Sequence, residues 1–136
     1  KDPATGLKDG SAMQVWKKMI IAQGGNPDIE IPVAKQKEKV VATQSGYITD
    51  LDAYAIGLSA WRLGAGRAKK EDAVSKTAGI ICLAKEGDYV EKDQPVLELH
   101  IDEASRLPFA KEALKNAFTI GAEPKEKRKI ILERIS

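Results

Sequence analysis

Cysteine and histidine are almost absent from this sequence of 136 residues. The single cysteine, Cys82, excludes an internal disulfide and a cysteine-based zinc site, and it fits a reducing compartment such as the cytoplasm. With one histidine, His100, the sequence also lacks the nitrogen ligands that most transition-metal sites need. We therefore expect a cytoplasmic protein without a bound metal.

Aromatic residues, long apolar runs and an excess of one charge are missing as well. Aromatic residues make up only 5% of the chain, too few for a platform on which RNA or single-stranded DNA bases stack. A net charge of +2, with both signs interspersed, gives no strong field toward nucleic acid or a membrane surface. No apolar run approaches the roughly 18–20 residues that cross a bilayer. We expect no nucleic-acid partner and no membrane partner.

What is present indicates an ordinary globular domain. Hydrophobic residues at 43% and charged residues at 31% are typical of soluble proteins, and the length fits a single domain over residues 1–136. The sequence starts at Lys1 without a methionine and moves directly into a helical pattern. We therefore expect a piece of a longer protein, with a processed or tagged start as the alternative.

Hydrophobic periodicity predicts a mixture of helices and strands. Leu97, Leu99 and Ile101 alternate with Glu98 and His100, which is typical of a half-buried strand. Strands are expected at 38–44 and 46–52 (joined around Ser45-Gly46), as a strand–turn–strand over 79–101, and at 127–136. Helices are expected at 11–23 (capped by Ser11 and ended by Gly24), 53–64 (ended by a left-handed Gly64), 70–78 and 102–121 (ended by Gly121).

Glycine-rich turns provide the sharpest local signals for a binding site. In the turn Gly64–Arg67, backbone amides with Lys69 and Lys70 nearby could hold an anion. Alternatively, Gly64 ends a helix, Gly66 permits a second unusual backbone angle, and the lysines are solvated. The turn matches neither the Walker pattern nor the full dinucleotide fingerprint, so the structural interpretation is favoured. The pair Gly24-Gly25 is likewise interpreted as a helix stop.

Other polar residues give no complete active site. Cys82 and His100 are the only possible thiol–imidazole pair, but Cys82 lies in an apolar run and neither residue has an activating neighbourhood. Residues 125–129 form a basic run that is interpreted as a solvated face. Scattered carboxylates are interpreted as caps and turn residues: Asp50, Asp52, Glu71, Asp72, Glu86 and Asp88. No catalytic, cofactor-binding or metal-binding residue is assigned.

Two strand-rich blocks, "VVATQSGYITDLDAYAIG" and "GIICLAKEGDYVEKDQPVLELH", resemble the two halves of a biotinyl/lipoyl-type barrel-sandwich domain. In that family a lysine at a hairpin tip, usually after methionine, carries the cofactor. No Met-Lys pair occurs in these blocks, since Met13 and Met19 lie in the first helix. The resemblance thus implies an α+β, hammerhead-like (barrel-sandwich hybrid) fold with mixed or antiparallel strands and flanking helices. A non-enzymatic binding or carrier module stays an alternative.

Longer motifs resemble the C-terminal part of the pyrimidine nucleoside phosphorylases, the family that includes thymidine phosphorylase. The resemblance runs from about Leu7 to the end of the chain. Its most specific pieces, in fixed order, are Gln23-Gly24-Gly25, Gly46-Tyr47, Ile56-Gly57, Leu63-Gly64-Ala65-Gly66-Arg67 and Gly87-Asp88-Tyr89-Val90.

This resemblance implies reversible phosphorolysis of pyrimidine nucleosides to a free base and a pentose 1-phosphate. It implies inorganic phosphate as co-substrate, no other cofactor, and usually a homodimer. In such enzymes the phosphate and base sites lie in segments that would precede Lys1, so no catalytic residue is carried onto this chain. We expect those N-terminal segments as its partners, and the chain by itself to be inactive. On this view Gly64–Arg67 is a structural turn.

Overall fold

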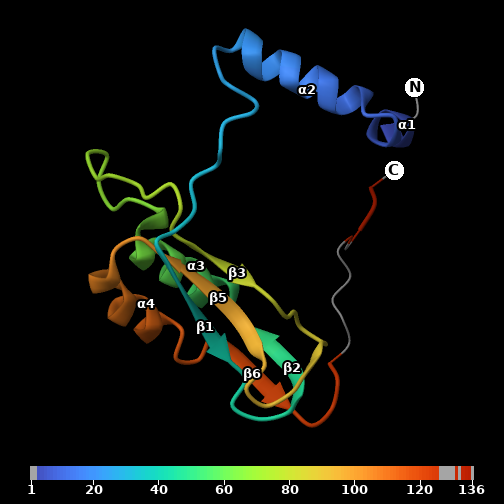
Figure 1. Cartoon of the computed structure of the whole chain (residues 1–136). Helices are drawn as coiled ribbons and strands as arrows, with labels where there is room; N and C mark the ends of the chain where they lie inside the picture. The colour runs from blue at the N-terminus through green and yellow to red at the C-terminus, as the bar shows by residue number, and fades with distance from the viewer. Residues whose placement is uncertain (1–2, 126–130, 132, 136) are drawn as a thin grey trace. The chain divides into compact units, whose positions relative to one another are not determined.

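A computed structural model of the protein describes residues 3–125, 131 and 133–135 (Figure 1). The chain divides into two compact units, and the boundary in the sequence lies between Ile31 and Pro32. Each unit is described by itself, and the assignment of residues 1–136 to a single domain stays a prediction. The strand expected at 127–136 falls mainly outside the described residues.

The first unit consists of two helices, α1 (Pro3–Lys8) and α2 (Ser11–Ala22). The expected helix at 11–23 is thereby confirmed, but Ser11 does not cap it. Gly10 is the N-cap residue, and the Ser11 amide itself donates to Asp9 Oδ1 over 2.9 Å. At the other end the amides of Gly24 and Gly25 donate to helix carbonyls over 3.0 and 2.9 Å, which agrees with a helix stop.

The second unit contains two three-stranded antiparallel sheets. Sheet A has the order β1 (Gln36–Val41), β5 (Pro95–Ile101), β3 (Gly79–Cys82), and sheet B has the order β4 (Tyr89–Val90), β2 (Gly46–Leu51), β6 (Phe118–Gly121). These open sheets and the helices confirm the expected α+β class. The strands β1 and β2, consecutive in sequence, pair with distant partners in different sheets.

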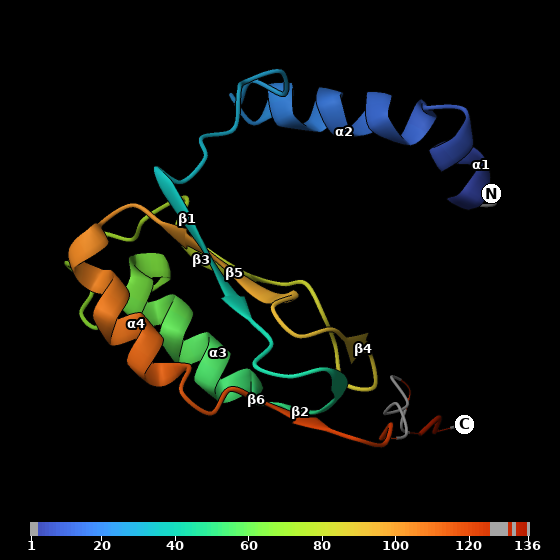
Figure 2. The ribbon, with the colours of Figure 1, turned by 60° about the horizontal axis from the view of Figure 1, so that its bottom comes forward.

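Helices α3 (Ala53–Ala60) and α4 (Leu107–Ala113) lie side by side along sheet A (Figure 2). Asp52 begins α3, because its carboxylate accepts from the amides of Tyr54 and Ala55 over 2.8 and 3.1 Å. A π-turn, η1 (Trp61–Ala65), continues α3, and a short 3-10 turn, η2 (Ala104–Arg106), precedes α4. Buried Ser59 joins the two helices by donating to the carbonyl of Ala110 over 3.0 Å.

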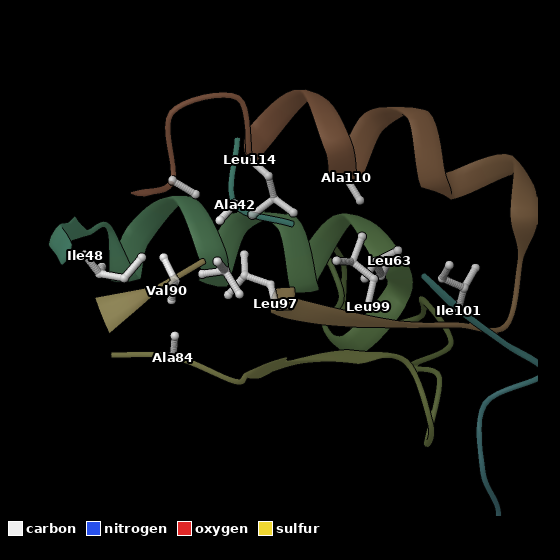
Figure 3. Packing of buried hydrophobic residues seen from close by; sticks show 12 residues of the cluster. Ala42, Ile48, Leu63, Ala84, Val90, Leu97, Leu99, Ile101, Ala110 and Leu114 are labelled. Carbon is white, nitrogen blue, oxygen red and sulfur yellow. The ribbon is translucent and has the colours of Figure 1, made fainter. Parts of the chain in front are cut away.

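The core lies between these helices and β5. Leu97, Leu99 and Ile101 occupy alternate positions of β5 and are almost fully buried, as the pattern of apolar and polar residues predicted. Ala110 and Leu114 point from the α4 side into the same cluster (Figure 3). This packing holds the second unit together and fixes the positions of η1, η2 and the end of β5.

One predicted helix is absent, and another is shorter than expected. Residues 70–78 form turns and bends instead of a helix, because the side chains of Asp72 and Ser75 accept from nearby backbone amides. The helix expected over 102–121 ends at Ala113, and Phe118–Gly121 becomes strand β6. Pairing of β6 with β2 satisfies backbone groups that a longer helix would have bonded locally.

No helix in the described part of the chain is long and apolar enough to cross a membrane.

Candidate functional site

The turn Gly64–Arg67 lies where η1 leaves the helical layer. Gly64 has φ +105°, so it occupies the left-handed region that was predicted for the end of this helix. Gly66 does not have the second unusual angle that was expected, because its φ of −143° is extended. A glycine fits there for a different reason: a Cβ at position 66 would lie 2.7 Å from Cδ1 of Trp61.

The amides after this turn hold a carboxylate of the protein itself. Asp72 Oδ2 accepts from the amides of Ala68 and Lys69 over 3.1 and 2.9 Å. The Arg67 guanidinium donates to the carbonyl of Lys70 over 3.2 Å. Backbone amides beside the turn therefore bind an anionic group, and that group is the Asp72 side chain. This arrangement agrees with a structural turn.

An open cleft of about 1250 Å³ runs beside the connection between η1 and β3. We call residues 66–77 of this connection the strap (Figure 1, yellow-green). The strap forms one wall of the cleft, and Trp61 and Phe109 contribute partly exposed aromatic rings. Cationic and anionic side chains line the cleft in equal number: Lys35, Arg62, Lys76 and Arg106 against Asp72, Asp102, Glu103 and Glu112. The cleft thus lacks the excess of positive charge that would favour a phosphate.

Both arginines of the cleft bond to neighbouring groups of the fold. Arg62 Nη1 donates to the carbonyl of Phe109 over 2.8 Å, and Arg106 Nε donates to Glu103 Oε2 over 2.9 Å. The first contact joins η1 to α4. The second joins the last residue of η2 to Glu103, the residue that precedes this turn. Both arginines thus hold neighbouring elements of the fold in place.

Cys82 and His100 do not form a pair. Cys82 lies opposite Leu97 and His100 opposite Gly79, at the two ends of β3. Leu97 and His100 are three positions apart on β5, so the alternation of a strand puts the thiol and the imidazole on opposite faces of sheet A. The structure thus agrees with the view that these residues are not a catalytic couple.

On the outer face of sheet A, His100 instead joins a small polar cluster. Glu98 Oε1 accepts from Lys37 Nζ over 3.0 Å and contacts His100 Nε2 at 2.9 Å. Hydrogen bonding from Lys37, and then from His100, holds the pKa of the Glu98 carboxyl below its ordinary value of 4.5.

This cluster predicts an acid-sensitive contribution to stability. A depressed folded-state pKa stabilises the fold above pH 4.5, and the contribution is lost as the pH falls through the lower folded value. We expect the urea midpoint to fall less steeply between pH 5 and pH 3 in Glu98→Gln than in the unaltered chain. Circular dichroism at several pH values measures this, and identical slopes for the two proteins would contradict the assignment. Glu112→Gln, which removes an exposed acid of α4, is the control.

Three of the six predicted carboxylates accept hydrogen bonds from the backbone. Asp52 caps α3 and Asp72 caps its own turn, while Asp88 Oδ2 accepts from the Lys85 amide over 2.9 Å. Lys125, the first residue of the basic run, has its Nζ 3.9 Å from Glu86 Oε1. Residues 126–129 of that run fall outside the described residues. Within the described ranges, no group of three or more histidine, cysteine or acidic side chains could hold a metal ion.

The cluster around Asp102 escaped the sequence analysis. Asp102 follows β5 and accepts hydrogen bonds from Ser75 and Thr77 in the strap. Its partners are 25 and 27 residues away, and no local spacing identifies such a set. The sequence analysis also missed the aromatic rings of Trp61 and Phe109, because no local pattern shows that both line one cleft.

The chain is similar in sequence to a known family and to named proteins. A family model described as the pyrimidine nucleoside phosphorylase C-terminal domain matches residues 47–121. A thymidine phosphorylase of Mycobacterium tuberculosis is 36% identical over 135 residues, which cover 99% of this chain and 32% of that protein. A pyrimidine-nucleoside phosphorylase of Geobacillus stearothermophilus is 32% identical over 135 residues, covering 96% of this chain and 31% of that protein. The chain spans about a third of the length of these curated relatives.

Proposed function

The chain belongs to the family of pyrimidine nucleoside phosphorylase C-terminal domains, and from this premise we propose that it acts as that domain within a complete phosphorylase. The proposed reaction is the reversible phosphorolysis of uridine- or thymidine-type nucleosides, which gives a free base and a pentose 1-phosphate. The observation that carries the proposal is the similarity to named phosphorylases along 93–99% of the chain.

The chemistry of phosphorolysis defines what the complete enzyme has to provide. Phosphate attacks C1′ while the base leaves, through a transition state with oxocarbenium character. The enzyme has to hold the anion near C1′ and stabilise the charge that develops on the base. We assign neither task to this chain, because the backbone amides that follow its glycine turn, those of Ala68 and Lys69, already bind Asp72. The N-terminal segments of the enzyme provide both sites in this proposal.

The proposed setting follows from the same assignment. The enzyme is a pentosyl-group glycosyltransferase of pyrimidine salvage, with inorganic phosphate as co-substrate and no other cofactor. It works in the cytoplasm as a homodimer. The domain's direct partners are the N-terminal segments of the same enzyme.

A paired phosphorolysis assay tests the proposal. We expect the longer protein encoded by the source gene to release uracil from uridine or thymine from thymidine in phosphate buffer. The present chain alone should release neither, because in this proposal the N-terminal segments provide the phosphate site and the base site. Reversed-phase chromatography measures the free base, and a reaction without phosphate is the control. Inactivity of the longer protein would contradict the proposed function, whereas activity of this chain alone would mean that it contains the site.

A further inference from the structure

The outer part of the strap and its ends are held by different sets of hydrogen bonds. Residues 67–74 are exposed, and their hydrogen bonds within the described part of the chain all close inside this segment. The outer part of the strap is therefore a small turn that keeps its own bonds wherever it lies. Only its two ends attach it to the body of the second unit.

The end near β3 is attached mainly through one carboxylate. Asp102 Oδ2 accepts from the hydroxyl of Ser75 and, over 2.5 Å, from the hydroxyl of Thr77. The Ser75 amide also donates to the carbonyl of Gly64 over 2.8 Å. Hydrogen bonds to an ionised acceptor are about twice as strong as neutral ones, so the two hydroxyl bonds dominate this attachment.

The carboxylate itself lies at the end of the central strand of sheet A. Asp102 directly follows Ile101, the buried last residue of β5, which is the central strand of sheet A. Its Oδ1 accepts from the Lys35 amide over 3.4 Å, at the point where β1 starts beside β5. Hydrogen bonding from Ser75 and then Thr77 holds the pKa of the Asp102 carboxyl below its ordinary value. The acceptor is thus ionised near neutral pH and fixed in place.

From this contrast we propose that Asp102 is a latch: its carboxylate fastens the strap along the cleft, and loss of that carboxylate lets the preformed outer turn swing away. The device goes beyond the proposed function, because it concerns the shape of the cleft and does not depend on the reaction. A local opening of this kind needs only the end contacts to break, while the core under α3 and α4 stays folded.

Limited trypsin digestion under native conditions tests the latch, because the strap itself carries cleavage sites at Arg67, Lys69 and Lys70. We expect Asp102→Asn to be cut in the strap about tenfold faster than the unaltered chain, since a neutral amide replaces a charged acceptor. Cleavage after Lys111 in α4 of the same unit should keep its rate. Mass spectrometry of the fragments over time gives both rates.

A second variant tests the same contact by changing its hydrogen-bond donor in the strap. Thr77→Val keeps the shape of the side chain and removes one hydroxyl, so it should accelerate strap cleavage in the same direction. In the double variant, Thr77→Val should add nothing to Asp102→Asn, because the charged contact is already lost. If Asp102→Asn does not fold, the single Thr77→Val variant decides the question.

Tryptophan fluorescence supplies an independent readout. Trp61 packs closely on Gly66 at the other end of the strap, so release of the strap should shift its emission in a Trp16→Phe background. Faster strap cleavage with a shifted emission and an unchanged rate at Lys111 supports the latch. Unchanged strap cleavage overturns it. Equal acceleration at Lys111 also overturns it, because the unit would then have loosened as a whole.

Discussion

Replacing Gly46 with alanine is expected to destabilise the second unit by about 3 kcal/mol. A Cβ at this position would lie 2.6 Å from the backbone oxygen of Gly121 and 2.7 Å from Cγ2 of Ile120. Backbone atoms cannot move aside easily here, because β2 and β6 pair at Tyr47 and Gly121. In addition, Gly46 has φ +153°, a conformation that residues with a side chain rarely adopt.

The test is a urea unfolding curve followed by circular dichroism. Gly79→Ala is the matched control, because Gly79 is also a strand glycine but a Cβ there meets nothing within 4 Å. We expect Gly79→Ala to change the free energy of unfolding by less than about 1 kcal/mol. Equal losses for the two variants would show that the close approach of β2 to β6 is not the reason for glycine at position 46.

Truncation of Leu99 is expected to have the other large effect, a loss of about 2–5 kcal/mol for Leu99→Ala. Leu99 is fully buried in the middle of β5, between β1 and β3 in the sheet and under the helical layer (Figure 3). The loss combines the transfer of its methyl groups with the cavity that remains, since three neighbouring elements hold the walls apart.

Ile81→Ala is the control for this prediction. Ile81 lies opposite Glu98 on the outer face of sheet A and the residue is 47% exposed, so it loses less contact on truncation. We expect a loss below about 1.5 kcal/mol for this variant. Urea unfolding of both variants measures the difference. A similar loss for Leu99→Ala and Ile81→Ala would contradict the location of the core between β5 and the helices.

Local patterns in the sequence predicted the regular elements wherever tertiary contacts reinforced them. Alternation identified β5, and Ser45-Gly46 marked the start of β2. Gly64 was correctly expected in a left-handed conformation, because a residue without a Cβ accepts that angle at the end of a helix. Patterns failed at 70–78 and 114–121, where side-chain acceptors and a distant strand partner competed with the helix.

At the candidate site, too, the sequence predicted some features and missed others. The sequence analysis favoured a structural turn at Gly64–Arg67 over an anion site, and it did not reveal that the next two amides, of Ala68 and Lys69, bind Asp72. Gly66 was assigned to an unusual angle, whereas it actually makes room for Trp61. Both outcomes depend on which side chain the folded loop brings within reach.

The sequence by itself determined the family, the α+β class and the alternation that buries β5, because these depend on order, spacing and composition. The tertiary structure alone decided the pairing of β1 and β2 with distant strands, the cleft beside the strap, and the contacts of Asp102 with Ser75 and Thr77. These features join residues that are far apart in the chain. Their energies exist only after packing has overcome the entropy of closing the intervening loops, so no local pattern records them.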